Sequence, residues 1–146
     1  MKHYITPEQF SANEDAPSSI VEAPFKFIRM PYNAEAGGYA TVAVPDNWDG
    51  KIAARVRFVR NGVATSMGAS VYCNGHPITN TNEAHAEVVA DVMGSNGGIV
   101  LSDIVEMDCS ALSGHTMSVK VSPDLATTTE EEPIDIALVE LFIGTY

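Results

Sequence analysis

The sequence predicts an all-β protein, an antiparallel β-sandwich of the jelly-roll type with about eight strands. Two observations predict this fold class. Residues 51–60 (KIAARVRFVR) alternate between apolar and mostly basic side chains, as a strand with one buried face does. Similar short segments recur through the 146 residues at fairly even spacing, bounded by turn residues and without any internal repeat or heptad pattern. This pattern favours a sandwich over repeated β-α-β units, and a hydrophobic fraction of 45% is enough for one core.

The strand at residues 51–60 is expected to form a β-hairpin with the segment that follows it. Asn61 and Gly62 form a strong turn signal between the two. Apolar side chains again take alternate positions in residues 63–73. The inward-facing sets are Ile52, Ala54, Val56 and Phe58, then Val63, Thr65, Met67, Ala69, Val71 and Cys73, whereas Lys51, Arg55 and Arg57 face outward.

Further strands are predicted along the body of the chain. They are Phe25–Met30, Tyr39–Val44, Glu83–Met93, Ile99–Leu101, Ile104–Met107, Thr116–Ser122 and Ile134–Ile143. The composition of Glu83–Met93 also suits a helix, but its alternation favours a strand. Residues 99–107 form either two short strands or one bent strand. Ile134–Ile143 is apolar on both faces, as expected of a central strand or of one buried between subunits.

The first 22 residues differ from the rest and are predicted to form an extended N-terminal arm. They are polar, contain two prolines and show no periodicity. Tyr4, Ile5 and Phe10 are nevertheless apolar, so the arm is expected to bury them. Two alternatives stay open: the arm docks on another protein, or it folds back over its own core. Residues 23–146 are expected to form one sandwich domain.

The net charge of the chain limits the classes of partner that it can bind. A formal net charge of −11 disfavours nucleic acid, whose phosphates an acidic surface repels. No apolar run approaches the about 20 residues of a membrane span, and the N-terminus lacks the apolar region of a signal peptide. Arg55 and Arg57 lie in a local basic stripe, which is either a solvated face or an interface with acidic residues of a neighbouring copy. Cys73 and Cys109 are expected to be buried thiols and not a disulfide.

No motif in the sequence supports catalysis, so we expect neither an enzyme nor a cofactor. Nucleophile-elbow, phosphate-loop, zinc-protease and dinucleotide signatures are absent, and the histidines lack metal-ligand spacing. Residues 46–50 are too short for a calcium loop. Trp48, the single tryptophan, lies in this predicted loop. It either covers one end of the core or offers a platform on which a sugar stacks.

Several segments of the chain resemble a family of viral proteins. Residues 44–52 (VPDNWDGKI) lead directly into a long alternating strand, and residues 136–146 (IALVELFIGTY) form an apolar final strand. Between them, Ile104–Met107 and Met117–Val121 flank a turn at residues 112–114. Over residues 24–146, this layout resembles small jelly-roll virion proteins of tailed bacteriophages, which include capsid decoration (cement) proteins, head-fibre proteins and tail-fibre tip domains. The resemblance implies a non-enzymatic structural role and a homotrimer.

The resemblance leads to two expected functions. The first is a capsid decoration protein that binds the outer capsid surface as a trimer and stabilises it, with the major capsid protein or another virion protein as its partner. Tyr4, Ile5 and Phe10 would anchor it there. The alternative is a receptor- or glycan-binding domain of a tail fibre or head fibre, with Trp48 as a glycan contact. Either protein would be found in the virion, after assembly in the host cytoplasm.

Overall fold

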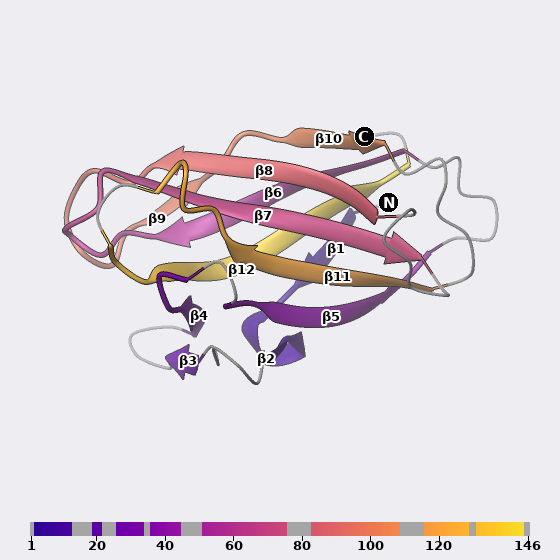
Figure 1. The fold of residues 1–146 in the computed structure, drawn as a ribbon, viewed down its shortest axis with the longest axis horizontal. Helices are drawn as coiled ribbons and strands as arrows, with labels where there is room; N and C mark the ends of the chain where they lie inside the picture. The colour runs from indigo at the N-terminus through magenta and orange to yellow at the C-terminus, as the bar shows by residue number, and fades with distance from the viewer. Residues whose placement is uncertain are drawn as a thin grey trace.

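The structure is a computed structural model, and it describes residues 2–12, 19–21, 26–33, 36–44, 51–75, 83–108, 116–128 and 131–144 (Figure 1). Within these residues, the chain forms twelve strands and one short 3-10 helix, η1 (Pro7–Gln9). The strands are β1 (Lys2–Ile5), β2 (Ser11–Ala12), β3 (Ser19–Val21), β4 (Phe27–Met30), β5 (Gly38–Ala43), β6 (Lys51–Val59), β7 (Ser66–Gly75), β8 (Glu83–Asp91), β9 (Ile99–Leu101), β10 (Val105–Asp108), β11 (Thr116–Pro123) and β12 (Ile134–Ile143).

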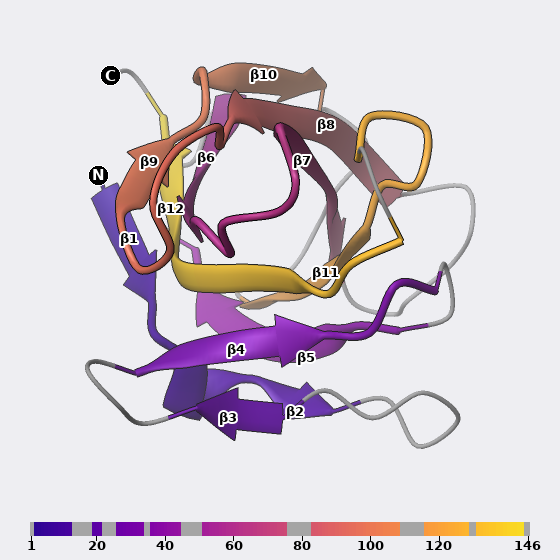
Figure 2. The ribbon, with the colours of Figure 1, turned by 90° about the vertical axis from the view of Figure 1, so that its left-hand side faces the viewer.

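The strands form two antiparallel sheets, so the predicted sandwich is confirmed. Sheet A has the order β10-β6-β12-β4-β3, with β1 also paired to β12 and β9 also paired to β6. Sheet B has the order β2-β5-β11-β7-β8. Figure 2 shows the two layers wrapped around one interior, with β6 and β12 on one side and β11, β7 and β8 on the other. The strand number exceeds the predicted eight because short strands in the N-terminal residues pair with strands of both sheets.

The predicted hairpin between β6 and β7 is wrong, because the two strands belong to different sheets. The turn itself exists: Asn61 Oδ1 accepts hydrogen bonds from the backbone N–H groups of Val63 and Ala64, both at 2.9 Å. Gly62 has a φ of +80°, a conformation that glycine adopts without a steric penalty. The chain then crosses to sheet B, where β7 begins at Ser66. The apolar faces of β6 and β7 therefore meet across the core and do not lie side by side.

Two predicted inward positions are wrong: Val63 and Thr65 lie before the start of β7 and are exposed, whereas Ala64 between them is buried. The strand predictions that follow are confirmed. Residues 83–91 form strand β8, and their inward positions are buried, as the alternation indicates. Residues 99–107 form two separate strands, β9 and β10. Strand β12 is central, since β6 pairs with one edge and β4 and β1 pair with the other. Trp48, Cys109 and the turn predicted at residues 112–114 lie outside the described residues.

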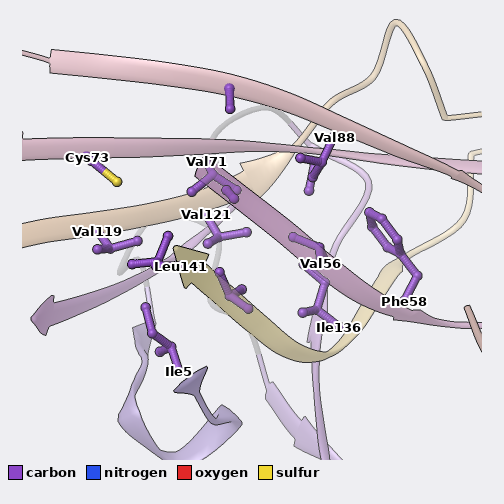
Figure 3. Packing of buried hydrophobic residues seen from close by; sticks show 14 of the residues in the cluster. Ile5, Val56, Phe58, Val71, Cys73, Val88, Val119, Val121, Ile136 and Leu141 are labelled. Atoms are coloured by element: carbon purple, nitrogen blue, oxygen red, sulfur yellow. The ribbon is translucent and has the colours of Figure 1, made fainter. Parts of the chain in front are cut away.

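The core lies between the two sheets and consists of aliphatic side chains with few aromatic rings (Figure 3). Side chains from β6 and β12 face side chains from β7, β8 and β11. The labelled members are Val56, Phe58, Ile136 and Leu141 on sheet A, and Val71, Cys73, Val88, Val119 and Val121 on sheet B. Each larger apolar side chain buried in this way contributes about 1.5–3 kcal/mol to stability. The packed core holds both sheets rigid and fixes which residues face outward.

The described N-terminal residues fold onto the chain's own core, the second of the two alternatives left open above. Strand β1 pairs with β12, and Ile5 is completely buried beside the core residues of both sheets (Figure 3). Phe10 is half-buried and packs against the core next to Gly38. Strands β2 and β3 pair with β5 and β4. Whether this segment also contacts another protein stays a prediction.

Candidate functional site

A row of four large side chains crosses the outer face of sheet B. Tyr39 on β5 lies opposite Lys120 on β11, Lys120 lies opposite Tyr72 on β7, and Tyr72 lies opposite His85 on β8. Residues directly opposite each other in antiparallel strands project from the same face of the sheet. Their chain neighbours, such as Val119, point into the core, so the row points outward. Figure 1 shows the four strands side by side. We call these residues the tyrosine–lysine row.

Close ring contacts order the side chains of the row. The rings of Tyr72 and His85 are stacked, with centroids 4.4 Å apart and planes only 4° from parallel. The Nζ atom of Lys120 lies 4.3 Å from the centroid of the Tyr72 ring, which is a cation–π contact. Tyr39 at the other end is 44% exposed. Because neighbouring strands are about 4.8 Å apart, the row spans about 14 Å.

Small polar side chains flank the row on both sides. The neighbouring cross-strand positions carry hydroxyl, amide and carboxylate groups on the same outer face. They are Thr41, Ser118 and Asn74 on one side, and Ser122, Ser70 and Glu87 on the other. Ser70, Asn74 and Ser122 are buried, so the flanking groups that solvent reaches are those of Thr41, Ser118 and Glu87.

The chain that follows β11 covers one end of this face. Ser66 Oγ donates a hydrogen bond to the Thr127 carbonyl at 2.7 Å, and the Gly68 N–H donates to Thr128 Oγ1 at 3.0 Å. The fit requires glycine, since a Cβ at Gly68 would lie 1.7 Å from Thr127 Oγ1. The covered end reaches Ser70 on β7, which is buried, whereas Tyr39 and His85 at the two ends of the tyrosine–lysine row are exposed and Tyr72 and Lys120 are half-buried.

A second cluster lies on the outer face of sheet A, around the carboxylate of Glu140. Its side chain is completely buried beneath three cations: Arg55 at 2.5 Å, Lys2 at 3.0 Å and Arg57 at 3.1 Å. Burial raises the pKa of the Glu140 carboxyl, but hydrogen bonds from the three cations outweigh burial and lower that pKa to about 2. Glu140 therefore stays ionised and holds the cations together on this face.

The structure places the predicted site residues at several different positions. Arg55 and Arg57 face outward as predicted, but both bind Glu140 of the same chain. Tyr4 lies on the same face, 46% exposed and opposite Glu140 in the register, whereas Ile5 and Phe10 pack against the core. An interface between this stripe and a neighbouring copy stays a prediction. The sequence did not single out the tyrosine–lysine row.

The described residues offer binding groups and no metal centre. Among them, no three histidine, cysteine or carboxylate side chains are close enough together to hold a metal ion. No helix in this part of the chain is long and apolar enough to cross a membrane. The chemistry of the tyrosine–lysine row is stacking, cation binding and hydrogen bonding.

Comparisons with known proteins identify the type of fold. No family model and no curated protein sequence matches the chain. The solved structure of an exo-β-1,3-galactanase from Phanerochaete chrysosporium is 16% identical with a TM-score of 0.64, over 97% of this chain but only 29% of that one. The CBM36-1 domain of a multidomain xylanase from the hindgut metagenome of Trinervitermes trinervoides has a TM-score of 0.61 at 7% identity, with 100% of both chains covered.

A third structure has the same fold over its whole length. The C-terminal CBM6 of a marine laminarinase from Zobellia galactanivorans has a TM-score of 0.57 at 12% identity, over 97% of this chain and 98% of that one. At such identities, the likeness establishes the fold alone. This chain therefore has a jelly-roll-like β-sandwich of the kind found in carbohydrate-binding modules.

Proposed function

We propose that this protein is a carbohydrate-binding module and that its glycan lies along the tyrosine–lysine row. The observation that carries the proposal is the row itself: aromatic rings and a cation aligned on the outer face of one sheet, with the hydroxyls of Thr41 and Ser118 beside them. The full-length structural neighbours named as carbohydrate-binding modules support it. It corresponds to the glycan-binding alternative expected from the sequence. The comparisons give no support to capsid decoration.

The chemistry of the row suits a sugar. The C–H groups of a pyranose form apolar patches that pack on aromatic rings, while its hydroxyls need hydrogen-bond partners. Tyr39 offers an exposed ring at one end of the row, and the tips of Lys120, Tyr72 and His85 offer polar atoms along it. These groups bind a sugar without breaking a bond, so we propose binding and not catalysis.

The scaffold supports this function because it is rigid. Each residue of the row stands on a different strand of one sheet, and most of the inward positions next to the row are buried. The rings of Tyr72 and His85 already hold each other in place. A site that is ordered before binding loses less conformational entropy when the ligand arrives, so more of the contact energy appears as affinity.

The proposal is tested by affinity electrophoresis against a panel of soluble polysaccharides, with Tyr39→Ala as the test variant. Loss of the exposed Tyr39 ring is expected to weaken binding about tenfold or more. Tyr4→Ala is a matched control, because Tyr4 is similarly exposed (46% against 44%) but lies on the opposite sheet. The proposal would be contradicted if Tyr39→Ala bound the polysaccharides as tightly as wild type does. It would also be contradicted if no polysaccharide of the panel slowed the migration of the wild-type protein.

A further inference from the structure

Lys120 has a distinctive position among the cations of the chain. All eight lysines and arginines are among the described residues, and only Lys120 lies on a strand of sheet B. The other seven lie on sheet A strands or on residues directly next to them. A single cation therefore stands on the outer face of sheet B, with Tyr39 and Tyr72 as its cross-strand neighbours.

Lys120 also differs from the other cations in its contacts. Carboxylates of this chain pair with five of them: Lys2, Arg55 and Arg57 with Glu140, Arg29 with Asp135, and Lys26 with Glu8. Among the described residues, no carboxylate lies within 4.0 Å of Lys120. Its ammonium group rests on the Tyr72 ring instead.

The consequence is a positive charge that is oriented but not neutralised. A cation–π contact attracts the ammonium to the ring face and leaves its full charge in place. In a chain of net charge −11, a carboxylate would be an easily supplied partner, yet the residues opposite Lys120 are both tyrosines. A charged donor held in this way binds an anion about twice as strongly as a neutral donor binds a neutral acceptor.

We infer that the tyrosine–lysine row selects glycans that carry an anionic group, either a uronate carboxylate or a sulfate ester, and that Lys120 binds this group. The inference rests on the proposed glycan-binding function and names its substrate class. Glu87 on β8 lies beside His85, with 4.0 Å between Nε2 and Oε1. Its charge repels an anion from that end of the row. The anionic group therefore lies between Tyr39 and Tyr72, and the neutral remainder of the sugar packs on the exposed Tyr39 ring.

The test compares neutral and anionic glycans of related backbone by isothermal titration calorimetry. Galactan is compared with polygalacturonate, and agarose with a sulfated carrageenan, so that the carboxylate and the sulfate are assessed separately. Wild type is expected to bind at least one anionic polymer about tenfold to a hundredfold more tightly than its neutral counterpart. The preference is expected to weaken between about 10 and 150 mM salt, because added ions screen an exposed charge.

Lys120→Met is the decisive variant, because methionine keeps an apolar stem against Tyr72 and removes only the charge. It is expected to lose the preference, so that the neutral and the anionic polymer bind this variant with affinities within about twofold of each other. Lys26→Met is the matched control, an exposed lysine beside sheet A that pairs with Glu8. Thermal unfolding of both variants verifies that they fold.

The outcomes separate the inference from the function on which it rests. Equal binding of neutral and anionic polymers by wild type, or an anionic preference that survives in Lys120→Met, would overturn the inference and leave the glycan-binding function intact. An absence of binding to all four polymers would overturn both. A preference for only the carboxylated or only the sulfated polymer would support the inference and identify the anion.

Discussion

Replacing Glu140 by glutamine is expected to remove a large part of the stability of sheet A. The pKa of its carboxyl is lowered from 4.5 to about 2, which corresponds to about 3 kcal/mol of preference for the ionised form in the folded protein. This figure already includes the cost of burial, because burial opposes the shift. Glu140→Gln keeps the shape of the side chain but gives Lys2, Arg55 and Arg57 a neutral partner. We therefore expect a loss of about 3 kcal/mol at pH 7.

The effect is expected to depend on pH in a defined direction. A carboxyl whose pKa is lowered by folding contributes stability above its unfolded pKa of 4.5, and that contribution disappears as the pH falls through about 2. The difference in free energy of unfolding between wild type and Glu140→Gln should therefore reach its whole value at pH 7 and be about half as large at pH 3. Other carboxylates titrate in the same range, but they are present in both proteins and cancel in the difference.

Urea unfolding at pH 7 and pH 3 measures this difference. Glu131→Gln is the control, because Glu131 is exposed and its change should alter the free energy of unfolding by less than about 0.5 kcal/mol. A Glu140→Gln protein as stable as wild type at pH 7 would refute the reasoning, since hydration of the three cations would then replace the buried contacts fully. A difference of the same size at both pH values would mean that the ionised carboxylate is not its cause.

Three further changes test the fold by chemical unfolding. Ile5→Ala is expected to lower the free energy of unfolding by about 2–5 kcal/mol, because Ile5 is fully buried. Tyr4→Ala, at the exposed neighbouring position, should lower it by less than about 1 kcal/mol. Equal effects would mean that β1 does not pack on the core. Gly68→Ala is expected to cost about 1–3 kcal/mol by displacing Thr127, and an unchanged midpoint would show that the covering segment moves freely. Asn61→Ala should cost about 1 kcal/mol for each of its two hydrogen bonds, unless water replaces them.

The sequence revealed the inner faces of the strands but not which strands pair. Alternation is a local property, so the inward positions of β6, β7, β8 and β11 follow from a few consecutive residues. Pairing is not local: the main partner of β6 is β12, so that Arg55 lies opposite Glu140, 85 positions further along the chain. A turn signal at Asn61 and Gly62 is compatible with both a hairpin and a crossing between sheets. The N-terminal strands were missed because they are too short to show a period.

The Glu140 cluster left a signal in the sequence that could have been used. Residues 134–143 are apolar except for Asp135 and Glu140, and a carboxylate within a buried strand needs a cationic partner. The outward-facing Arg55 and Arg57 were the obvious partners on a neighbouring strand, so an internal ion pair was predictable alongside an interface. The pairing of Lys2 with the same carboxylate was not predictable from the sequence, because it depends on β1 folding back onto β12.

The tyrosine–lysine row shows where sequence reasoning on its own must stop. Tyr39, Tyr72, His85 and Lys120 each occupy an outward position of a predicted strand, and by itself each is an ordinary surface residue. Their significance comes from the strand order β5-β11-β7-β8 and from a register that places all four on one line. A shift of one residue in a single strand would turn its member of the row into the core. The core residues that fix the register are therefore as necessary to the site as the row itself, although none of them would touch a sugar.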